Sequence, residues 1–205
     1  MPRQKASEEH RREAILRAAY DVAARHGVEA LTVRAVAARA AVSHGTVLFH
    51  FKRRDELVLV LLDRVLDATA LLRVPNTLDR LTRPTERMEA LLRAEMDRLS
   101  RDPRTFRLFL EYWTLGVRSA PIRRKVSAAL DRYRGTFQTI AEGVPDGVAA
   151  VAVSLVHGCA LQALIDPRGF GIEQHLGAAA RLLERLATPQ VDAAERLATP
   201  QVDAA

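Results

Sequence analysis

Apolar residues recur along most of the chain at intervals of three and four, the spacing of one face of an α-helix. Alternating apolar and polar runs, which mark half-buried β-strands, are absent, and only 5% of the residues are aromatic. The pattern therefore predicts an all-α protein of about nine helices. We expect them at residues 7–26, 33–40, 44–50, 54–73, 84–101, 103–118, 121–142, 147–166 and 172–187.

The first three helices are short and closely spaced. Gly27 follows the first helix, at the position where a chain often takes a left-handed conformation. Thr32 and Ser43 each precede a short helix and offer a hydroxyl that caps its first turn. Val47 and Phe51 are the apolar residues that would attach the third helix to the other two. Residues 1–53 are therefore predicted to form a helix-turn-helix domain.

The remaining helices predict a second domain over residues 54–187. The helix at 54–73 ends at Val74-Pro75-Asn76, and several later helices have a proline at or beside their first turn, where its missing N–H costs nothing. Connections this short are typical of a helical bundle.

Residues 184–194 recur unchanged as 195–205, which is too little for a repeat protein. We expect residues 188–205 to be a disordered tail.

Positive charge is concentrated at the N-terminal end. Residues 1–55 contain 11 Lys and Arg against 6 Asp and Glu, a balance of +5, whereas the rest of the chain carries only +1. The N-terminal end is therefore suited to binding a polyanion, whereas the rest of the chain has almost no net charge.

The segment LTVRAVAARAAVSHGTVLFHF at 31–51, followed by KRRDEL at 52–57, resembles the DNA-binding domain of the TetR family of bacterial transcriptional regulators. The resemblance extends from Arg12 to Leu61. It implies that the helix after Ser43 enters the major groove, which requires an apolar side attached to the domain and a groove-facing side of short or planar groups. Two positions depart from the family pattern, because Ala41 replaces the usual glycine of the turn and Leu48 replaces a tyrosine that reaches a phosphate.

The resemblance assigns a role to each matching residue. It implies base-edge contacts for Arg34, His44 and Thr46, and van der Waals or sugar contacts for Gly45 and Phe49. It implies phosphate contacts for Thr32, Ser43, His50 and Arg54. Charge and position alone add Lys52 and Arg53 to the DNA-binding residues.

Large apolar and aromatic side chains gather on the middle helices of the second domain. In the TetR family this domain encloses a pocket for a small-molecule effector, and residues 108–118 and 157–167 resemble a branch that includes the choline-responsive repressors. We expect an effector that is apolar or contacts aromatic rings. The predicted ligand-binding residues are Met88, Leu92, Met96, Phe109, Tyr112, Trp113, Tyr133, Phe137, His157 and Gln162.

The last two helices are predicted to form a homodimer interface. Residues 147–165 lack Asp, Glu, Lys and Arg, and we favour a bundle helix buried on every side over a membrane span for them. The final helix repeats apolar residues at the spacing of a bundle seam. This seam consists of Ile172, Leu176, Ala179, Leu183 and Leu186.

The chain lacks the sequence motifs of common active sites, including HExxH, CxxC, GxSxG and the P-loop. We expect no enzyme activity, cofactor or metal, and the single Cys159 and the absence of a signal peptide favour the cytoplasm. The predicted function is a ligand-responsive repressor that binds a double-stranded, palindromic operator as a homodimer. A transcriptional activator, a nonspecific DNA-binding protein and a helical ligand carrier or enzyme remain open alternatives.

Overall fold

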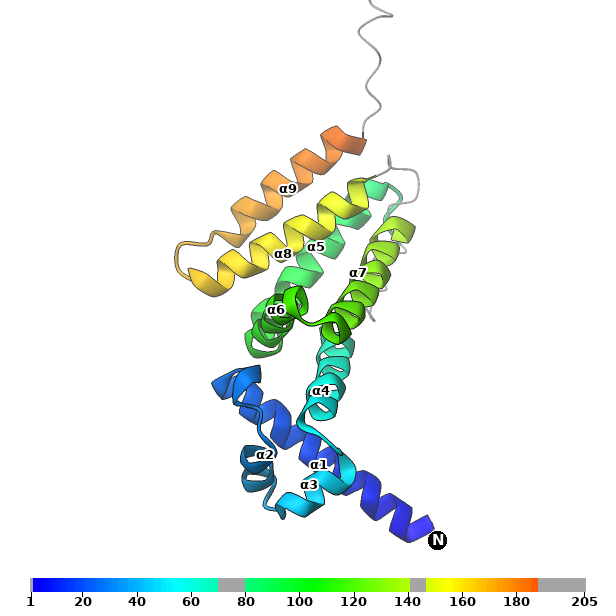
Figure 1. Ribbon diagram of the computed structural model, residues 1–205. Helices are drawn as coiled ribbons and strands as arrows, with labels where there is room; N and C mark the ends of the chain where they lie inside the picture. Colours follow the sequence, from blue (N-terminus) through cyan, green and yellow to red (C-terminus); the bar gives the residue numbers. More distant parts are fainter. Residues whose placement is uncertain (1, 70–79, 141–146, 188–205) are drawn as a thin grey trace, which may run out of the picture.

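A computed structural model describes residues 2–69, 80–140 and 147–187 and confirms the all-helical expectation, since no strand occurs among these residues. The chain forms a run of helices joined by short connections (Figure 1). These elements are α1 (Pro2–His26), the 3-10 turn η1 (Val28–Ala30), α2 (Val33–Ala40), α3 (His44–His50), α4 (Arg54–Thr69), α5 (Pro84–Arg101), α6 (Pro103–Arg118), α7 (Ala120–Ile140), α8 (Val148–Ile165) and α9 (Ile172–Ala187).

The helices fall into a head and a bundle. Figure 1 shows α1, α2 and α3 at one end of the molecule and α5 to α9 at the other, with α4 running between them. In the head, Ile15, Val36, Val47 and Phe51 are completely buried. Helix α4 packs against α1 in the head and against α6 and α7 in the bundle. Since the buried residues form one continuous cluster from α1 to α9, the division at residue 53 stays a prediction.

Both predicted helix caps are confirmed. The Thr32 hydroxyl accepts a hydrogen bond from the backbone N–H of Ala35 at 3.1 Å, and the Ser43 hydroxyl accepts one from the N–H of Thr46 at 3.0 Å. Each bond satisfies a first-turn amide that has no partner within its helix. Gly27 has a φ of +85°, a conformation that only glycine adopts without strain.

The turn between α2 and α3 uses alanine in a left-handed conformation. Ala41 has a φ of +53°, and it alone among the described non-glycine residues has a positive φ. The N–H of Ala41 bonds to the carbonyl of Ala38, and the N–H of Val42 bonds to that of Ala37, which is the Schellman arrangement. The departure from glycine noted in the sequence therefore falls where glycine is most favourable.

Several predicted boundaries differ from the structure. The first helix begins at Pro2 rather than at residue 7, because the good helix formers at residues 3–6 continue the helix and a proline is tolerated in its first turn. Helix α7 begins at Ala120, one residue before its proline. The break at 74–76 and the tail at 188–205 lie outside the described residues.

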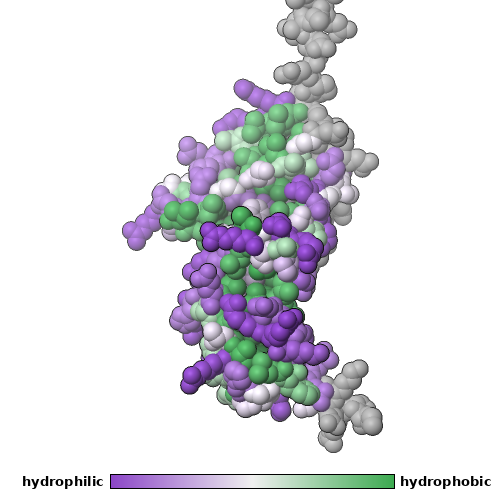
Figure 2. Space-filling model, in the orientation of Figure 1, coloured by the Kyte–Doolittle hydropathy of each residue, from purple (hydrophilic) through white to green (hydrophobic). Residues whose placement is uncertain are grey.

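The expectation that residues 147–166 are buried on every side is wrong for the single chain. Helix α8 is long and apolar enough to cross a membrane, a property it shares with core helices of soluble proteins, yet only a third of its residues are buried here. Val151, Leu161 and Ile165 are exposed, and the last of these is 75% exposed. Hydrophobic side chains also gather over the bundle helices in Figure 2. A partner outside this chain would have to cover that surface.

The seam predicted on the last helix packs inside the chain. Leu176, Ala179 and Leu183 are buried, and α9 contacts α5 and α8. By contrast, Leu182 and Leu186 are exposed on the outer side of the helix. The predicted seam is therefore divided, since Leu176, Ala179 and Leu183 pack within the chain and Leu186 stays exposed beside Leu182.

We predict that Ala41→Gly stabilises the protein. A non-glycine residue in the left-handed conformation costs about 1–2 kcal/mol, and the extra freedom of glycine in the unfolded chain offsets about half of that gain. The net increase in the free energy of unfolding should be about 0.5–1 kcal/mol, measured by urea denaturation.

The matched control is Ala40→Gly, one residue earlier and within the helix. It should lower the free energy of unfolding by about 0.5–1 kcal/mol. If both variants lost the same free energy of unfolding, Ala41 would not be strained.

Candidate DNA-binding surface and ligand-sensing core

Helix α3 has one buried side and one exposed side. Val47 and Phe51 are completely buried in the head, and the guanidinium of Arg12 lies 4.9 Å from the centre of the Phe51 ring. The Phe49 side chain is 73% exposed, and its ring contacts that of His50 edge to face at 5.1 Å. The structure places the other predicted contact residues Ser43, His44, Gly45, Thr46 and His50 on the exposed or partly exposed positions of the same segment.

Gly45 is not required by the fold. A side-chain carbon built there would meet only the Ser43 hydroxyl, at an ordinary 3.7 Å. A glycine at this place leaves room for another surface to approach the backbone closely. That observation agrees with the van der Waals or sugar contact predicted for Gly45.

The two arginines of α2 differ in their surroundings. Arg39 forms an ion pair with Asp21 of α1 at 2.5 Å, and it thereby holds two helices of the head together. Arg34 is exposed and has no hydrogen bond or ion pair within the described part of the chain. Its guanidinium is therefore free to contact an external group.

The basic cluster after α3 also contains two kinds of residue. Lys52 and Arg53 have exposed side chains. Arg54 instead donates from Nε to the carbonyl of Leu31 at 2.7 Å and from Nη2 to that of Val28 at 3.3 Å. These bonds attach the start of α4 to the turn before α2. The phosphate contact predicted for Arg54 stays a prediction, and its hydrogen bonds give it a structural role as well.

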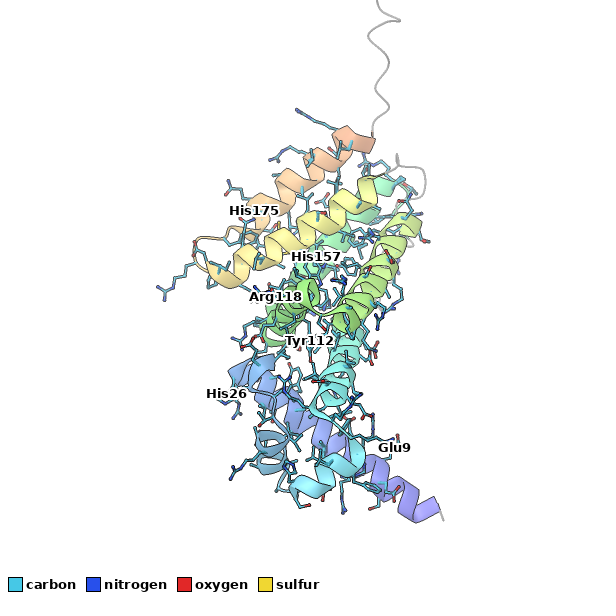
Figure 3. The ribbon with its side chains drawn as sticks, viewed as in Figure 1. Glu9, His26, Tyr112, Arg118, His157 and His175 are labelled. Atoms are coloured by element: carbon cyan, nitrogen blue, oxygen red, sulfur yellow. The ribbon has the colours of Figure 1, made fainter. Side chains whose placement is uncertain are left out.

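Aromatic rings from three helices meet in the bundle. The His157 ring of α8 lies 4.7 Å from Trp113 and 5.9 Å from Phe109, both on α6, and 5.4 Å from Tyr133 on α7. Phe137 extends this contact at 5.3 Å from Tyr133. We call these five residues the aromatic cluster. Figure 3 shows His157 within the bundle, with Tyr112 nearer to α4.

A partly buried ion pair lies beside the aromatic cluster, since a third of the Arg98 side-chain surface stays exposed. Glu95 of α5 is only 3% exposed, and its carboxylate accepts hydrogen bonds from Arg98 Nη2 at 2.5 Å and from the Tyr133 hydroxyl at 2.8 Å. The sequence analysis missed both Glu95 and Arg98 because charged residues on a helix are usually solvent-exposed. The spacing of residues could have revealed the burial of Glu95, since it falls on the same apolar stripe as Met88, Leu91 and Leu92.

One polar group in the cluster lacks a partner. The Trp113 indole Nε1 is buried and has no hydrogen-bond acceptor among the described residues. An unsatisfied buried N–H costs about 1–3 kcal/mol. Such a group calls for an explanation, either strain or an acceptor supplied from outside the chain.

The other predicted ligand-binding residues do not all join the cluster. Gln162 is exposed on α8 and does not join the cluster, and its predicted ligand contact stays a prediction. Leu92 and Met96 are buried, but they line a separate cavity of about 10 Å³ between α5, α8 and α9. A larger cleft of about 400 Å³ opens between η1, α4 and the α6–α7 turn, and none of the predicted ligand-binding residues lines it.

Helix α6 connects the aromatic cluster to the head. The Tyr112 hydroxyl is buried and donates to the carbonyl of Val58 in α4 at 2.9 Å. The Glu111 carboxylate accepts from the N–H of Val28 at 2.8 Å. Thr105 lies 2.7 Å from the Tyr20 hydroxyl, oxygen to oxygen, and Arg107 donates to the carbonyl of Ala24. Successive residues of one helix thus contact the head and the cluster.

Two family models match the chain. The model described as "Bacterial regulatory proteins, tetR family" matches residues 15–61, and the one described as "BetI-type transcriptional repressor, C-terminal" matches residues 84–188. The chain belongs to the TetR family of bacterial transcriptional regulators. The family predicted from the sequence is therefore confirmed, and with it a regulatory rather than an enzymatic role.

Individual relatives agree with this assignment. A helix-turn-helix transcriptional repressor of Mycobacterium tuberculosis is 46% identical over 52 residues, which span 25% of this chain and 28% of that protein. A transcriptional regulator from Rhodococcus has a similar structure, with a TM-score of 0.71 and 25% identity over 85% of this chain and 95% of its own. A regulator from Saccharomonospora viridis in complex with choline has a TM-score of 0.66 at 23% identity, covering 86% of this chain and 96% of its own.

We predict that His157 makes stability depend on pH. Burial lowers the pKa of His157 to about 4; its bond to the Val153 carbonyl opposes the shift, and the nearby Arg98 charge adds to it. As the pH falls from about 6.5 to 4, the unfolded chain gains a proton here that the folded protein does not. The free energy of unfolding should drop by about 2 kcal/mol between pH 7 and pH 5 because of this residue.

The measurement is urea unfolding of the wild type and of His157→Phe at the two pH values. Phe keeps a ring in the cluster but does not titrate. The wild type should lose more stability than the variant over this interval. Equal losses would mean that His157 is as easily protonated in the folded protein as in the unfolded chain.

Proposed function

We propose that this TetR-family protein is a cytoplasmic repressor that binds a palindromic operator as a homodimer and is released by a small molecule. The observation that carries the proposal is the two-sided α3. Its buried Val47 and Phe51 fix it to the head, while the Phe49 side chain is 73% exposed and His44 and Gly45 of the same helix are exposed too. We divide the chain into a DNA-binding domain at 1–53 and a sensing and dimerisation domain at 54–187.

The exposed groups of the head match the chemistry of duplex DNA. Arg34 has no partner within the described chain and is suited to a bidentate contact with guanine. The capped first turn of α3 presents backbone amides and hydroxyls from Ser43 and Thr46. Lys52 and Arg53 are positioned to contact phosphate. Thr32, His44, Gly45, His50 and Arg54 complete the predicted DNA-binding set.

The exposed apolar residues of α8 and α9 support a homodimer. Leu161 and Ile165 of α8 and Leu182 and Leu186 of α9 are all exposed in the single chain. Two such helix pairs related by a two-fold axis would bury these side chains in a four-helix interface. A dimer also presents two α3 helices, as recognition of half-sites about 34 Å apart requires.

The aromatic cluster is the best candidate for the effector site. It contains an unpaired buried donor, the Trp113 indole N–H. Trp113 and Phe109 of the cluster belong to α6, which hydrogen-bonds to both α1 and α4. A ligand that moves α6 would change the orientation of the head, so that the two α3 helices no longer fit successive grooves. By linkage, operator and ligand then weaken each other's binding by the same factor.

Selection of bound fragments from random duplex DNA tests operator binding. We expect an inverted repeat with half-sites one or more helical turns apart. Arg34→Ala should relax the base preference at one guanine position and cost about 1–3 kcal/mol of binding free energy. Lys52→Ala should weaken binding to all sequences alike and reduce the salt dependence of binding by about one phosphate contact.

Arg39→Ala is the matched control for these variants, because Arg39 lies on the same helix but is paired with Asp21. It should leave sequence preference unchanged. Selection that returns no common sequence, together with equal effects of Arg34→Ala and Lys52→Ala, would instead indicate nonspecific binding.

The dimer is tested by Leu161→Glu, which places a charge on the exposed apolar face of α8. We expect this variant to sediment as a monomer and to bind the operator at least about tenfold more weakly, because buried unpaired charges are strongly unfavourable. Val117→Glu is the control, since Val117 is 75% exposed and belongs to α6 rather than to α8 or α9. If the Leu161→Glu protein stayed dimeric, the dimer interface would lie elsewhere than on this face of α8.

A further inference from the structure

The unpaired Trp113 donor is exceptional among the polar groups around it. The Tyr112 hydroxyl donates to the Val58 carbonyl, and the Tyr133 hydroxyl donates to Glu95. The Glu95 carboxylate also accepts two bonds from Arg98, at 2.5 and 3.2 Å. With these groups already partnered, an incoming molecule would gain most by giving Trp113 Nε1 an acceptor.

His157 supplies a complementary acceptor next to this donor. Its Nδ1 lies 2.8 Å from the Val153 carbonyl, and a carbonyl only accepts, so Nδ1 carries the hydrogen. In the neutral ring, Nε2 then has a free lone pair. The rings of His157 and Trp113 are 4.7 Å apart, which places one donor ring and one acceptor ring side by side.

The charges at this site do not favour a cation. The buried Glu95 carboxylate would attract a cation, but it already accepts hydrogen bonds from Arg98 and Tyr133. Because Arg98 and Glu95 form an ion pair with each other, these two side chains offer an incoming ligand little net charge of either sign. The remaining walls are the rings of Phe109, Tyr133 and Phe137, which suit a flat apolar body.

We propose that the effector is an uncharged aromatic compound with a hydroxyl group, whose oxygen accepts from Trp113 Nε1 and whose hydrogen is donated to His157 Nε2. This inference rests on the proposed ligand-responsive function and specifies the chemistry of its ligand. It differs from the choline found in the Saccharomonospora viridis relative, which is a quaternary cation.

Trp113 is the single tryptophan of the chain, so its fluorescence reports directly on the proposed site. Three probes of similar size separate the possibilities: 4-ethylphenol, ethylbenzene and benzyltrimethylammonium. We expect 4-ethylphenol to change the Trp113 emission with the lowest Kd, ethylbenzene to bind at least about tenfold more weakly, as loss of a buried hydrogen-bonded group implies, and the cation to bind more weakly still.

Variants then test the two named groups, with binding measured by calorimetry. Trp113→Phe keeps a ring but removes the N–H, and His157→Phe keeps a ring but removes the acceptor. Each should bring the Kd of 4-ethylphenol close to that of ethylbenzene. Ser154→Ala changes an exposed residue of the same α8 helix and should leave both Kd values unchanged. Thermal unfolding of each variant confirms that it is folded.

Tighter binding of the cation, equal binding of 4-ethylphenol and ethylbenzene to the wild type, or no binding of 4-ethylphenol at millimolar concentration would each overturn the inference. The proposed repressor function fails separately, by the absence of operator binding in the fragment selection. A protein that binds its operator but shows no preference for the hydroxyl would therefore keep its proposed function and lose only this ligand class.

Discussion

The buried hydrogen bond from the Tyr112 hydroxyl to the Val58 carbonyl joins the two halves of this protein. It belongs to a set of contacts through which α6 holds both α4 and the head, including the Glu111 bond to the Val28 N–H. Gly27 makes room for that contact, because a side-chain carbon there would lie 3.3 Å from the Glu111 carboxylate. Helix α6 of the bundle thus holds the head that carries α3.

The same helix contributes Trp113 and Phe109 to the aromatic cluster, one turn or less from the residues that hold the head. A change in packing around Trp113 therefore has a short path to α1 and α4. The pair of Glu95 and Arg98 adds a constraint, because the buried Glu95 carboxylate remains favourable only while its hydrogen bonds are maintained. Tyr133 ties that pair to the cluster. Ligand entry must preserve or replace these bonds.

Local signals were sufficient for much of the fold. Thr32 and Ser43 cap helices through residues three positions away, so the sequence alone predicted their role. Contacts between distant segments were not predictable in this way: Arg54 bonds to carbonyls more than twenty residues earlier, and Glu95 is buried only because α7 supplies Tyr133. Gln162 was predicted in the pocket because helical spacing does not reveal which side of an apolar helix faces inward. The TetR resemblance predicted a set of DNA-binding residues, and both the set and the individual roles remain predictions.

The central claim is that hydrogen bonds from α6 fix the head relative to the sensing domain. The most direct measurement is the distance between spin labels on Glu29→Cys in the head and Arg132→Cys on α7, in a Cys159→Ser background diluted with unlabelled protein. We predict one narrow distance distribution, which broadens when Glu111→Ala and Tyr112→Phe are introduced together. An equally narrow distribution in that variant would contradict the account, since the head would then be held without α6.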